Sequence, residues 1–191
     1  MLTGGGGADI LTGGPGLDTA SYAASPAAVA VDIGAGTAIG GAATGDDLTS
    51  VEGVVGSAFA DTLTGDAADN VFLGMGGGDD LDAGLGFDFV YYQFSTSGVT
   101  VDLTAQTASG GHATGDTLAG FESVLGSSFA DVLSGNDDVN HLLGQGGDDT
   151  LAGFDGDDLL LGTTGIDTFS AGDGTDTCDF VAGEVHLSCE L

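Results

Sequence analysis

A nine-residue repeat is the feature that most constrains the fold of this chain. The repeat runs without a gap over residues 126–179, four more copies span residues 56–91, and two span residues 4–21. The first position is glycine in every copy except those that begin at Ala83 and Ala171. Glycine at a fixed position suits a tight turn that needs a positive φ or a close backbone approach. A fixed short period indicates a stacked architecture of identical small units.

Two further positions of the nonapeptide carry a constant type of side chain. The eighth position is apolar in every copy, from Leu11 to Cys178, so one side chain per repeat is expected to point into a common interior. The sixth position is always aspartate or asparagine. In chain order these residues are Asp9, Asp18, Asp61, Asn70, Asp79, Asp88, Asp131, Asn140, Asp149, Asp158, Asp167 and Asp176.

A longer period of 70 residues is superimposed on the short one. Residues 13–82 align with residues 83–152 without a gap, and about half of the positions are identical. We therefore predict one elongated domain over residues 1–191 with this internal duplication, terminal nonapeptides at 153–179 and a C-terminal cap at 180–191.

Each duplicated module contains a stretch without the nonapeptide pattern, residues 22–55 and 92–125. Both stretches still alternate like strands, at residues 29–33 and 99–103. We expect four half-coils of eight or nine residues with altered turns. A long loop or a small inserted lobe is the alternative, although loops of this length are uncommon in compact domains.

The charge of the chain excludes several kinds of partner. There is no lysine or arginine, and 30 acidic residues give a formal net charge of -30. Nucleic acids and anionic membrane surfaces are bound through basic patches, which this chain lacks. Acidic chains are often disordered, but 41% of the residues are apolar and need a place to be buried. A compact state of this charge is expected to take up cations. No apolar run approaches the roughly 20 residues needed for membrane insertion.

The nonapeptides resemble a known family. Residues 4–12, Gly-Gly-Gly-Gly-Ala-Asp-Ile-Leu-Thr, fit the pattern G-G-x-G-x-D-x-U-x at every defined position, and residues 153–161 depart from it only at the second. This is the repeat of the RTX, or hemolysin-type, calcium-binding proteins. The resemblance implies an all-β fold, a right-handed parallel β-roll or β-solenoid with two sheets. It also implies that six residues of each repeat form a turn, three form a strand, and two repeats complete one coil.

Sixth-position residues 18 apart are then expected to stack on one edge of the roll. Because neighbouring strands lie about 4.8 Å apart, carboxylates from adjacent turns can share a cation. Hard oxygen ligands from carboxylates and carbonyls suit Ca²⁺, of which we expect about four to eight ions. The four Asp–Asp pairs are Asp61/Asp79, Asp131/Asp149, Asp149/Asp167 and Asp158/Asp176, and two weaker pairs contain asparagine.

Acidic residues outside the sixth position and the histidines have different expected roles. Asp46 and Asp116, in degenerate turns, are expected to add ligands toward Asp61 and Asp131. Three aspartates at variable positions, Asp66, Asp137 and Asp155, are expected to cap their own turns. The three histidines form no group at ligand spacing, which disfavours zinc and iron. Without calcium we expect a disordered chain.

The two ends of the chain differ. A disulfide between Cys178 and Cys189 would cap the C-terminal end and agree with an extracellular location, and two buried free thiols are the alternative. The sequence begins inside a repeat at residues 1–3. Either it is a segment of a longer protein, or the uncapped first coil stacks on another molecule, because bare solenoid ends favour self-association.

Catalytic motifs are not visible in the sequence, and we expect no enzyme activity. There is no H-E-x-x-H, no G-x-S-x-G and no P-loop. We expect a calcium-binding structural module of a secreted or cell-surface protein, such as an adhesin, surface layer or filament. One alternative is an accessory domain of a secreted RTX protease, lipase or polysaccharide epimerase. The other is ice or glycan binding by a flat face, which is disfavoured because the turns carry glycine and aspartate.

Overall fold

The computed structural model describes residues 1–179, 185–187 and 189. Over these residues the chain is all-β apart from two short 3-10 helices, η1 (Gly41–Ala43) and η2 (Gly111–Ala113). It forms two compact units. The first unit comprises Met1–Val90 and Thr114–Phe121, and the second comprises Tyr91–Ala113 and Glu122–Leu191. Among the described residues, no helix is long and apolar enough to cross a membrane.

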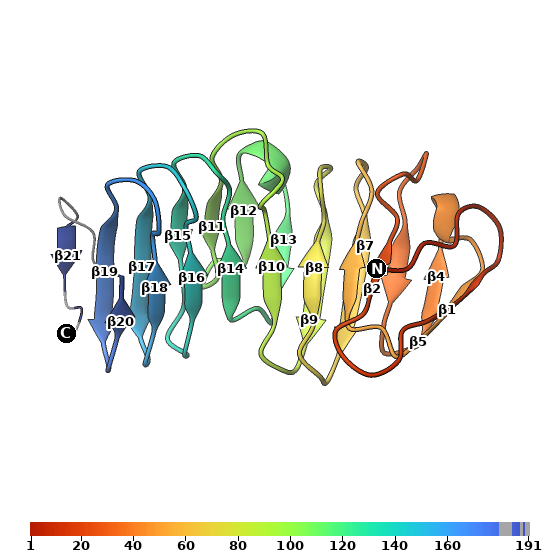
Figure 1. Cartoon of the computed structure of the whole chain (residues 1–191), viewed down its shortest axis with the longest axis horizontal. Helices are drawn as coiled ribbons and strands as arrows, with labels where there is room; N and C mark the ends of the chain where they lie inside the picture. The colour runs from red at the N-terminus through yellow and green to blue at the C-terminus, as the bar shows by residue number, and fades with distance from the viewer. Residues whose placement is uncertain (180–184, 188, 190–191) are drawn as a thin grey trace. The chain divides into compact units, whose positions relative to one another are not determined.

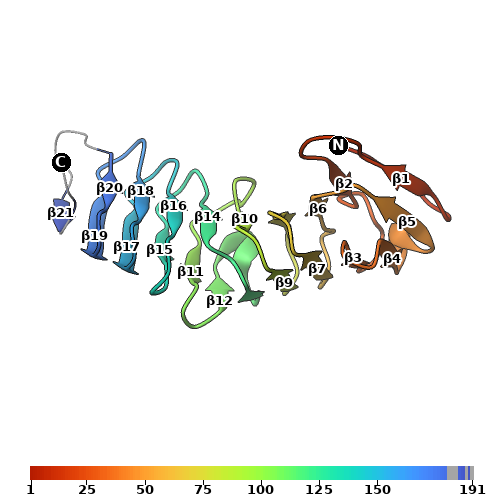
Figure 2. The same cartoon turned by 90° about the horizontal axis from the view of Figure 1, so that it is seen from below.

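The strands of the first unit lie in two sheets; most of these strands are labelled in Figure 1, and the others in Figure 2. The larger sheet has the order β1-β5-β4-β3-β7-β9-β13, with bounds β1 (Ile10–Thr12), β5 (Asp46–Thr49), β4 (Thr37–Ile39), β3 (Ala30–Asp32), β7 (Thr62–Asp66), β9 (Asp80–Gly84) and β13 (Thr117–Ala119). The smaller sheet has the order β2-β6-β8-β10, with bounds β2 (Thr19–Ser21), β6 (Gly53–Val55), β8 (Val71–Leu73) and β10 (Phe89–Tyr91).

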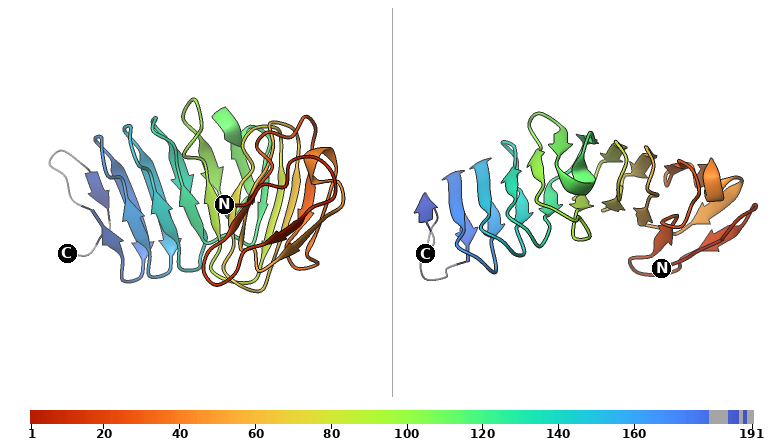
Figure 3. Two further views of the ribbon diagram at one scale, coloured as in Figure 1. Left: turned by 45° about the vertical axis from the view of Figure 1, so that its right-hand side comes forward. Right: turned by 90° about the horizontal axis from the view of Figure 1, so that it is seen from above.

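The second unit repeats this arrangement. One sheet contains β12 (Thr107–Ser109), β11 (Thr100–Asp102), β15 (Val132–Ser134), β17 (Thr150–Asp155), β19 (Thr168–Asp173) and β21 (Val185–Leu187). The other contains β14 (Ser123–Leu125), β16 (His141–Leu143), β18 (Leu159–Leu161) and β20 (Thr177–Cys178). Figure 2 shows β15, β17 and β19 facing β16, β18 and β20, and Figure 3 shows the coils, cyan to blue, stacked in parallel.

The nonapeptide explains both sheets. Each strand of a nonapeptide begins directly after the sixth position, as Thr150 follows Asp149, and its second residue is buried. Leu133, Leu151 and Phe169 stack in parallel register in one sheet of the second unit, and all three are fully buried. In the other sheet Leu142, Leu160 and Cys178 stack in the same way. The predicted parallel β-roll with two sheets is therefore confirmed.

The stretches without the nonapeptide pattern differ from the expected series of coils. Residues 22–55 do contribute strands to the roll, but β4 runs antiparallel to both β3 and β5. The reversal follows Asp32, whose Oδ1 accepts a hydrogen bond from the N–H of Ala35 at 2.7 Å, and Gly36 then has φ of 68°. A Cβ at Gly36 would collide with the Leu48 carbonyl, so this hairpin requires glycine there. The same hairpin recurs as β11 and β12, 70 residues later.

Candidate metal centre

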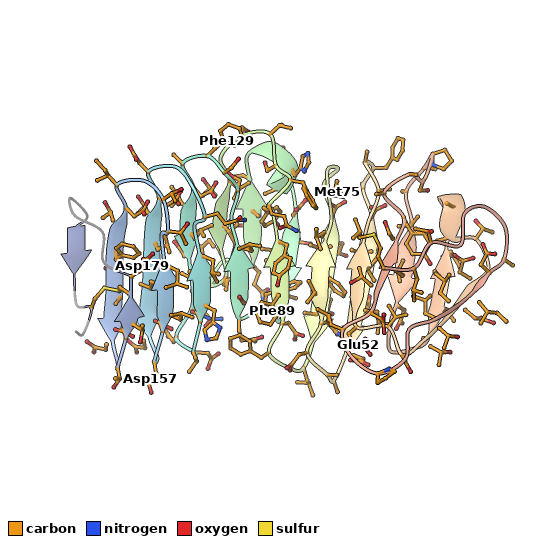
Figure 4. All side chains as sticks on the ribbon, in the orientation of Figure 1. Glu52, Met75, Phe89, Phe129, Asp157 and Asp179 are labelled. Carbon is orange, nitrogen blue, oxygen red and sulfur yellow. A yellow bond between two sulfur atoms is a disulfide. The ribbon has the colours of Figure 1, made fainter. Side chains whose placement is uncertain are left out.

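The sixth-position side chains from Asp61 to Asp176 are buried although they lie in turns. Asp61, Asp79, Asp149, Asp158 and Asp176 each have a side chain that is at most 2% exposed. Successive turns emerge at opposite edges, as Phe129 and Asp157 of the second unit show in Figure 4. Residues 18 apart therefore meet on the same edge, as the repeat predicts.

Hydrogen bonds connect these residues into ladders. In the second unit the N–H of Asp131 donates to Asp149 Oδ1 at 2.8 Å, and the N–H of Asp149 donates to Asp167 Oδ1 at 2.8 Å. On the opposite edge, Asn140 donates to Asp158 Oδ1 at 2.8 Å and Asp158 donates to Asp176 Oδ1 at 3.0 Å. All the expected neighbours in the second unit thus come together.

The first unit contains shorter ladders of the same kind. The N–H of Asp61 donates to Asp79 Oδ1 at 2.9 Å, and the N–H of Asn70 donates to Asp88 Oδ1 at 2.6 Å. In the second nonapeptide, the N–H of Asp18 donates to Glu52 Oε2 at 2.9 Å. The role of Glu52 was not foreseen, because it lies outside the nonapeptides; its only signal was its recurrence as Glu122 in the duplication.

Asp46 and Asp116 belong to these ladders but at places other than those expected. Asp46 Oδ1 accepts the N–H of Asp9 at 2.9 Å, and its Oδ2 accepts the Tyr22 hydroxyl at 3.1 Å. The expectation that Asp46 lies beside Asp61 is wrong, because the β3–β4 hairpin separates β5 from β7. Asp116 Oδ1 accepts the N–H of Asp79 at 2.9 Å, so its observed ladder neighbour is Asp79 instead of Asp131.

The second carboxylate oxygen of several ladder residues has no hydrogen-bond donor. The Oδ2 atoms of Asp9, Asp79, Asp149, Asp158 and Asp176 are buried and make no hydrogen bond among the described residues. A buried oxygen without a donor is costly unless a proton or a cation satisfies it. These oxygens are therefore the part of the site that fits a metal ion.

The raised pKa values of three ladder aspartates also fit a metal site. Burial, supplemented by the charges of Asp116 and Asp61, raises the pKa of Asp79 to about 7. Burial likewise raises the pKa of Asp149 and of Asp158 to about 6, with the neighbouring aspartates of each ladder adding to the effect. The isolated carboxylates are thus poorly stabilised as anions, which is the condition that a bound cation would relieve.

Glycine at the first position leaves room for these oxygens. A Cβ placed on Gly144 would lie closer than 3.0 Å to Asp149 Oδ2, and one on Gly153 would lie equally close to Asp158 Oδ2. The carboxylate therefore packs directly against the glycine backbone of its own turn. This close approach explains why the first position is glycine in most copies.

The donor set suits calcium better than a softer metal. In the part of the chain that the structure describes, no three His, Cys, Asp or Glu side chains gather into one cluster. The available donors are carboxylate oxygens from stacked turns together with backbone carbonyls, which are hard ligands with flexible geometry. Zinc and iron sites instead combine nitrogen or sulfur ligands at fixed spacing.

A second set of turn aspartates supports the ladders from outside. Asp69, Asp148 and Asp157 occupy the fifth position of their nonapeptides. Each accepts a hydrogen bond from the backbone N–H at the fifth position of the next turn on the same edge, 18 residues later, at 2.9 Å in each case. Sequence reasoning did not single out these residues, although the Asp-Asp doublets at 148–149 and 157–158 mark two of them.

The C-terminal cysteines are joined to each other. The structure contains a disulfide between Cys178, at the inward position of β20, and Cys189. It links the last nonapeptide to the segment after it. Most of the predicted cap at 180–191 lies outside the described residues, apart from β21 and Cys189.

Comparison with known proteins agrees with the geometry. The model of the RTX calcium-binding nonapeptide repeat matches the chain in four copies, at residues 1–20, 55–90, 116–151 and 152–184. No curated protein matches the chain. The matched segments cover more than half of the sequence and contain every sixth-position residue. This chain therefore belongs to the RTX family of calcium-binding nonapeptide repeat proteins.

Proposed function

We propose that this chain is a structural module that folds when calcium binds to its stacked turns, as part of a secreted or cell-surface protein such as an adhesin, surface layer or filament. The observation that carries the proposal is the set of buried Oδ2 atoms without a hydrogen-bond donor, which all belong to sixth-position aspartates of the nonapeptides. The sixth-position aspartates, joined by Asp46 and Asp116, would hold the ions. Calcium would supply positive charge and would be coordinated by the oxygens that have no hydrogen-bond donor.

The energy scale supports a folding role for the metal. An ion present at a hundred times its dissociation constant stabilises the folded state by about 2.7 kcal/mol per site. A few such sites reach the 5–15 kcal/mol that typically stabilises a whole domain. A net charge of -30 with no lysine or arginine opposes folding of the calcium-free chain. Low intracellular calcium would keep the chain unfolded before export, and extracellular calcium would fold it.

Circular dichroism during a calcium titration tests this proposal directly. Calcium-depleted protein should give the spectrum of a disordered chain, and adding Ca²⁺ should produce a β-sheet spectrum in a cooperative transition. Mg²⁺ at the same concentration should be much less effective, because it demands stricter octahedral geometry. A spectrum that is unchanged by thorough chelation would contradict the proposal.

A structural role is supported by the calcium-binding repeats themselves, which the family model matches over more than half of the chain. Assembly into a filament or layer would require the calcium-loaded module to associate with itself. Sedimentation velocity with and without Ca²⁺ tests this part separately. Calcium-dependent large species would support an assembling surface role, whereas a monomer at all concentrations would favour an accessory module of a larger secreted protein.

A further inference from the structure

The twelve turns of this protein are of two kinds, which the backbone separates cleanly. In eight nonapeptides the second and fourth residues both have positive φ, and we call these open turns. They begin at residues 4, 13, 74, 83, 144, 153, 162 and 171. In the other four, which begin at residues 56, 65, 126 and 135, neither position has positive φ, and we call these closed turns. All positions compared lie in the described part of the chain.

A side chain at the second position holds each closed turn together. In the turn that begins at residue 126, Ser127 Oγ accepts the N–H of Phe129 at 3.1 Å. In the turn that begins at 135, Asn136 Oδ1 accepts the N–H of Asp138 at 2.9 Å. Their counterparts, Ser57 and Asp66, accept the same hydrogen bonds from residues 59 and 68 in the first unit. Serine and asparagine stabilise turns in this way.

The same residue also satisfies the sixth position. The N–H of Ser127 donates to Asp131 Oδ2 at 2.6 Å, and its hydroxyl donates to Asp131 Oδ1 at 2.8 Å. Asp131 Oδ1 accepts a third hydrogen bond from the N–H of Val99 at 2.7 Å. Asp61 has the same three donors in the first unit: the N–H and hydroxyl of Ser57 and the N–H of Val29. These carboxylates already have three hydrogen-bond donors each.

The two remaining closed turns carry asparagine in place of aspartate. Asn140 Oδ1 accepts the N–H of Asn136 at 2.7 Å, and Asn70 Oδ1 accepts the N–H of Asp66 at 2.8 Å. The amide groups donate to the backbone oxygens of Glu122 and Glu52, at 3.3 Å in both cases. All eight open turns carry aspartate at this position. A neutral side chain therefore occurs only where the turn is closed.

Open turns have the opposite properties. Four of them place a residue other than glycine at positive φ in the second position, namely Met75, Gln145, Phe154 and Thr163. Such conformations are strained and persist where something else holds the turn. The Oδ2 atoms without a hydrogen-bond donor at Asp79, Asp149, Asp158 and Asp176 also belong to open turns. Strain and unsatisfied oxygens thus occur together.

We propose that the four closed turns take no calcium, and that a second-position side chain does in them what the cation does in open turns. This inference rests on the proposed function. Two Asp–Asp pairs, Asp149/Asp167 and Asp158/Asp176, join open turns, and they form complete cation sites. The pairs Asp61/Asp79 and Asp131/Asp149 each contain one closed turn, so only one of their two carboxylates has an oxygen available to a cation. Each nonapeptide block that follows an antiparallel hairpin therefore begins with two turns that fold without calcium.

Counting bound calcium in matched variants tests the inference. The full-length protein, Asp131→Asn and Asp158→Asn would each be titrated with Ca²⁺ by isothermal calorimetry, and the ions counted by native mass spectrometry. Asp131→Asn, in a closed turn, should bind as many ions as the parent. Asp158→Asn, in an open turn, should bind at least one fewer. Circular dichroism in saturating calcium verifies that each variant is folded.

A converse variant adds a site. Ser127→Gly combined with Phe129→Gly should open the turn that stacks beside the turn of Asp149, and should increase the number of bound calcium ions by one. Ser128→Gly, an exposed neighbour in the same turn, is the control and should leave the count unchanged. Equal losses in Asp131→Asn and Asp158→Asn, or no gain in the double glycine variant, would overturn the inference while leaving calcium binding intact. A parent protein that binds no calcium would instead refute the proposed function.

Discussion

Acidification should fold the calcium-free chain, because protons can replace calcium at the buried aspartates. The pKa of Asp79 in the folded state is about 7, and those of Asp149 and Asp158 are about 6, against an ordinary value of 3.8. The folded state therefore holds protons that the unfolded state has released between about pH 4 and pH 6. The stabilising contribution is complete below pH 3.8 and is lost as the pH rises through 6 to 7.

The size of the effect follows from the number of protons. Each group contributes at most about 1.4 kcal/mol per pH unit, so three groups give about 4 kcal/mol per pH unit. This slope depends on the number of protons, whereas the size of each pKa increase sets the pH range over which the slope applies. Circular dichroism of calcium-depleted protein between pH 4.5 and 7.5 follows the folded fraction, and urea unfolding at the acidic pH values where the chain is folded measures the slope.

Two double variants distinguish the effect of the buried carboxylates on the pH dependence from the effect of the overall charge. Asp149→Asn with Asp158→Asn removes two of the three carboxyl groups whose pKa rises to about 6 or 7, so the slope should fall by about half or more. Asp148→Asn with Asp157→Asn removes the same charge from exposed positions and keeps the oxygens that accept the N–H groups of later turns. Its slope should stay close to that of the parent, because Asp148 and Asp157 are the smallest contributors to the raised pKa of Asp149 and Asp158. Equal flattening in both double variants would show that general charge repulsion governs the pH dependence, and would refute the reasoning.

Three further predictions concern the calcium-loaded protein. Leu151→Ala, at a fully buried position, should lower the free energy of unfolding by about 2–5 kcal/mol in urea titrations; a loss below 1 kcal/mol would contradict a packed interior. Replacing Cys178 and Cys189 by alanine should lower the free energy of unfolding by about 3 kcal/mol, by the loop-closure estimate for a separation of 11 residues. Thermal scans should show a lower midpoint, and an unchanged midpoint would show that the disulfide contributes no stability. Tyr22→Phe removes the donor to Asp46 Oδ2 and should cost about 1 kcal/mol in the same urea assay; a neutral result would mean that Asp46 finds another donor.

The repeat predicts most of the fold because it constrains every coil in the same way. A period of nine with one inward residue gives short strands whose middle positions stack, as Leu133, Leu151 and Phe169 do. The sixth position then falls at each turn end, where backbone N–H groups of one coil meet carboxylates of the next. Local pattern and global stacking agree, which is the condition for reading structure from sequence.

The prediction fails where the chain reverses direction. Nothing in the alternation at residues 29–33 distinguishes a strand followed by a parallel coil from one followed by a hairpin, since both bury alternate residues. The reversal depends on a local bond from the N–H of Ala35 to Asp32 and on the left-handed conformation of Gly36. Because the hairpin inserts β4 into the sheet, β5 pairs with β1, and Asp46 moves to the side of Asp9.

The sixth position alone could not reveal which turns need a cation. Asp131 and Asp149 have the same place in their nonapeptides and comparable burial, yet one has three hydrogen-bond donors and the other has a buried oxygen with none. The difference lies at the second and fourth positions, where Ser127 and Phe129 stand in the closed turn and Gln145 and Gly147 in the open one. A carboxylate that is already satisfied gains little from an ion, whereas an unsatisfied one makes folding depend on it. Whether a turn needs calcium to fold should therefore depend on the hydrogen-bond donors around its aspartate, and not on the presence of the aspartate alone.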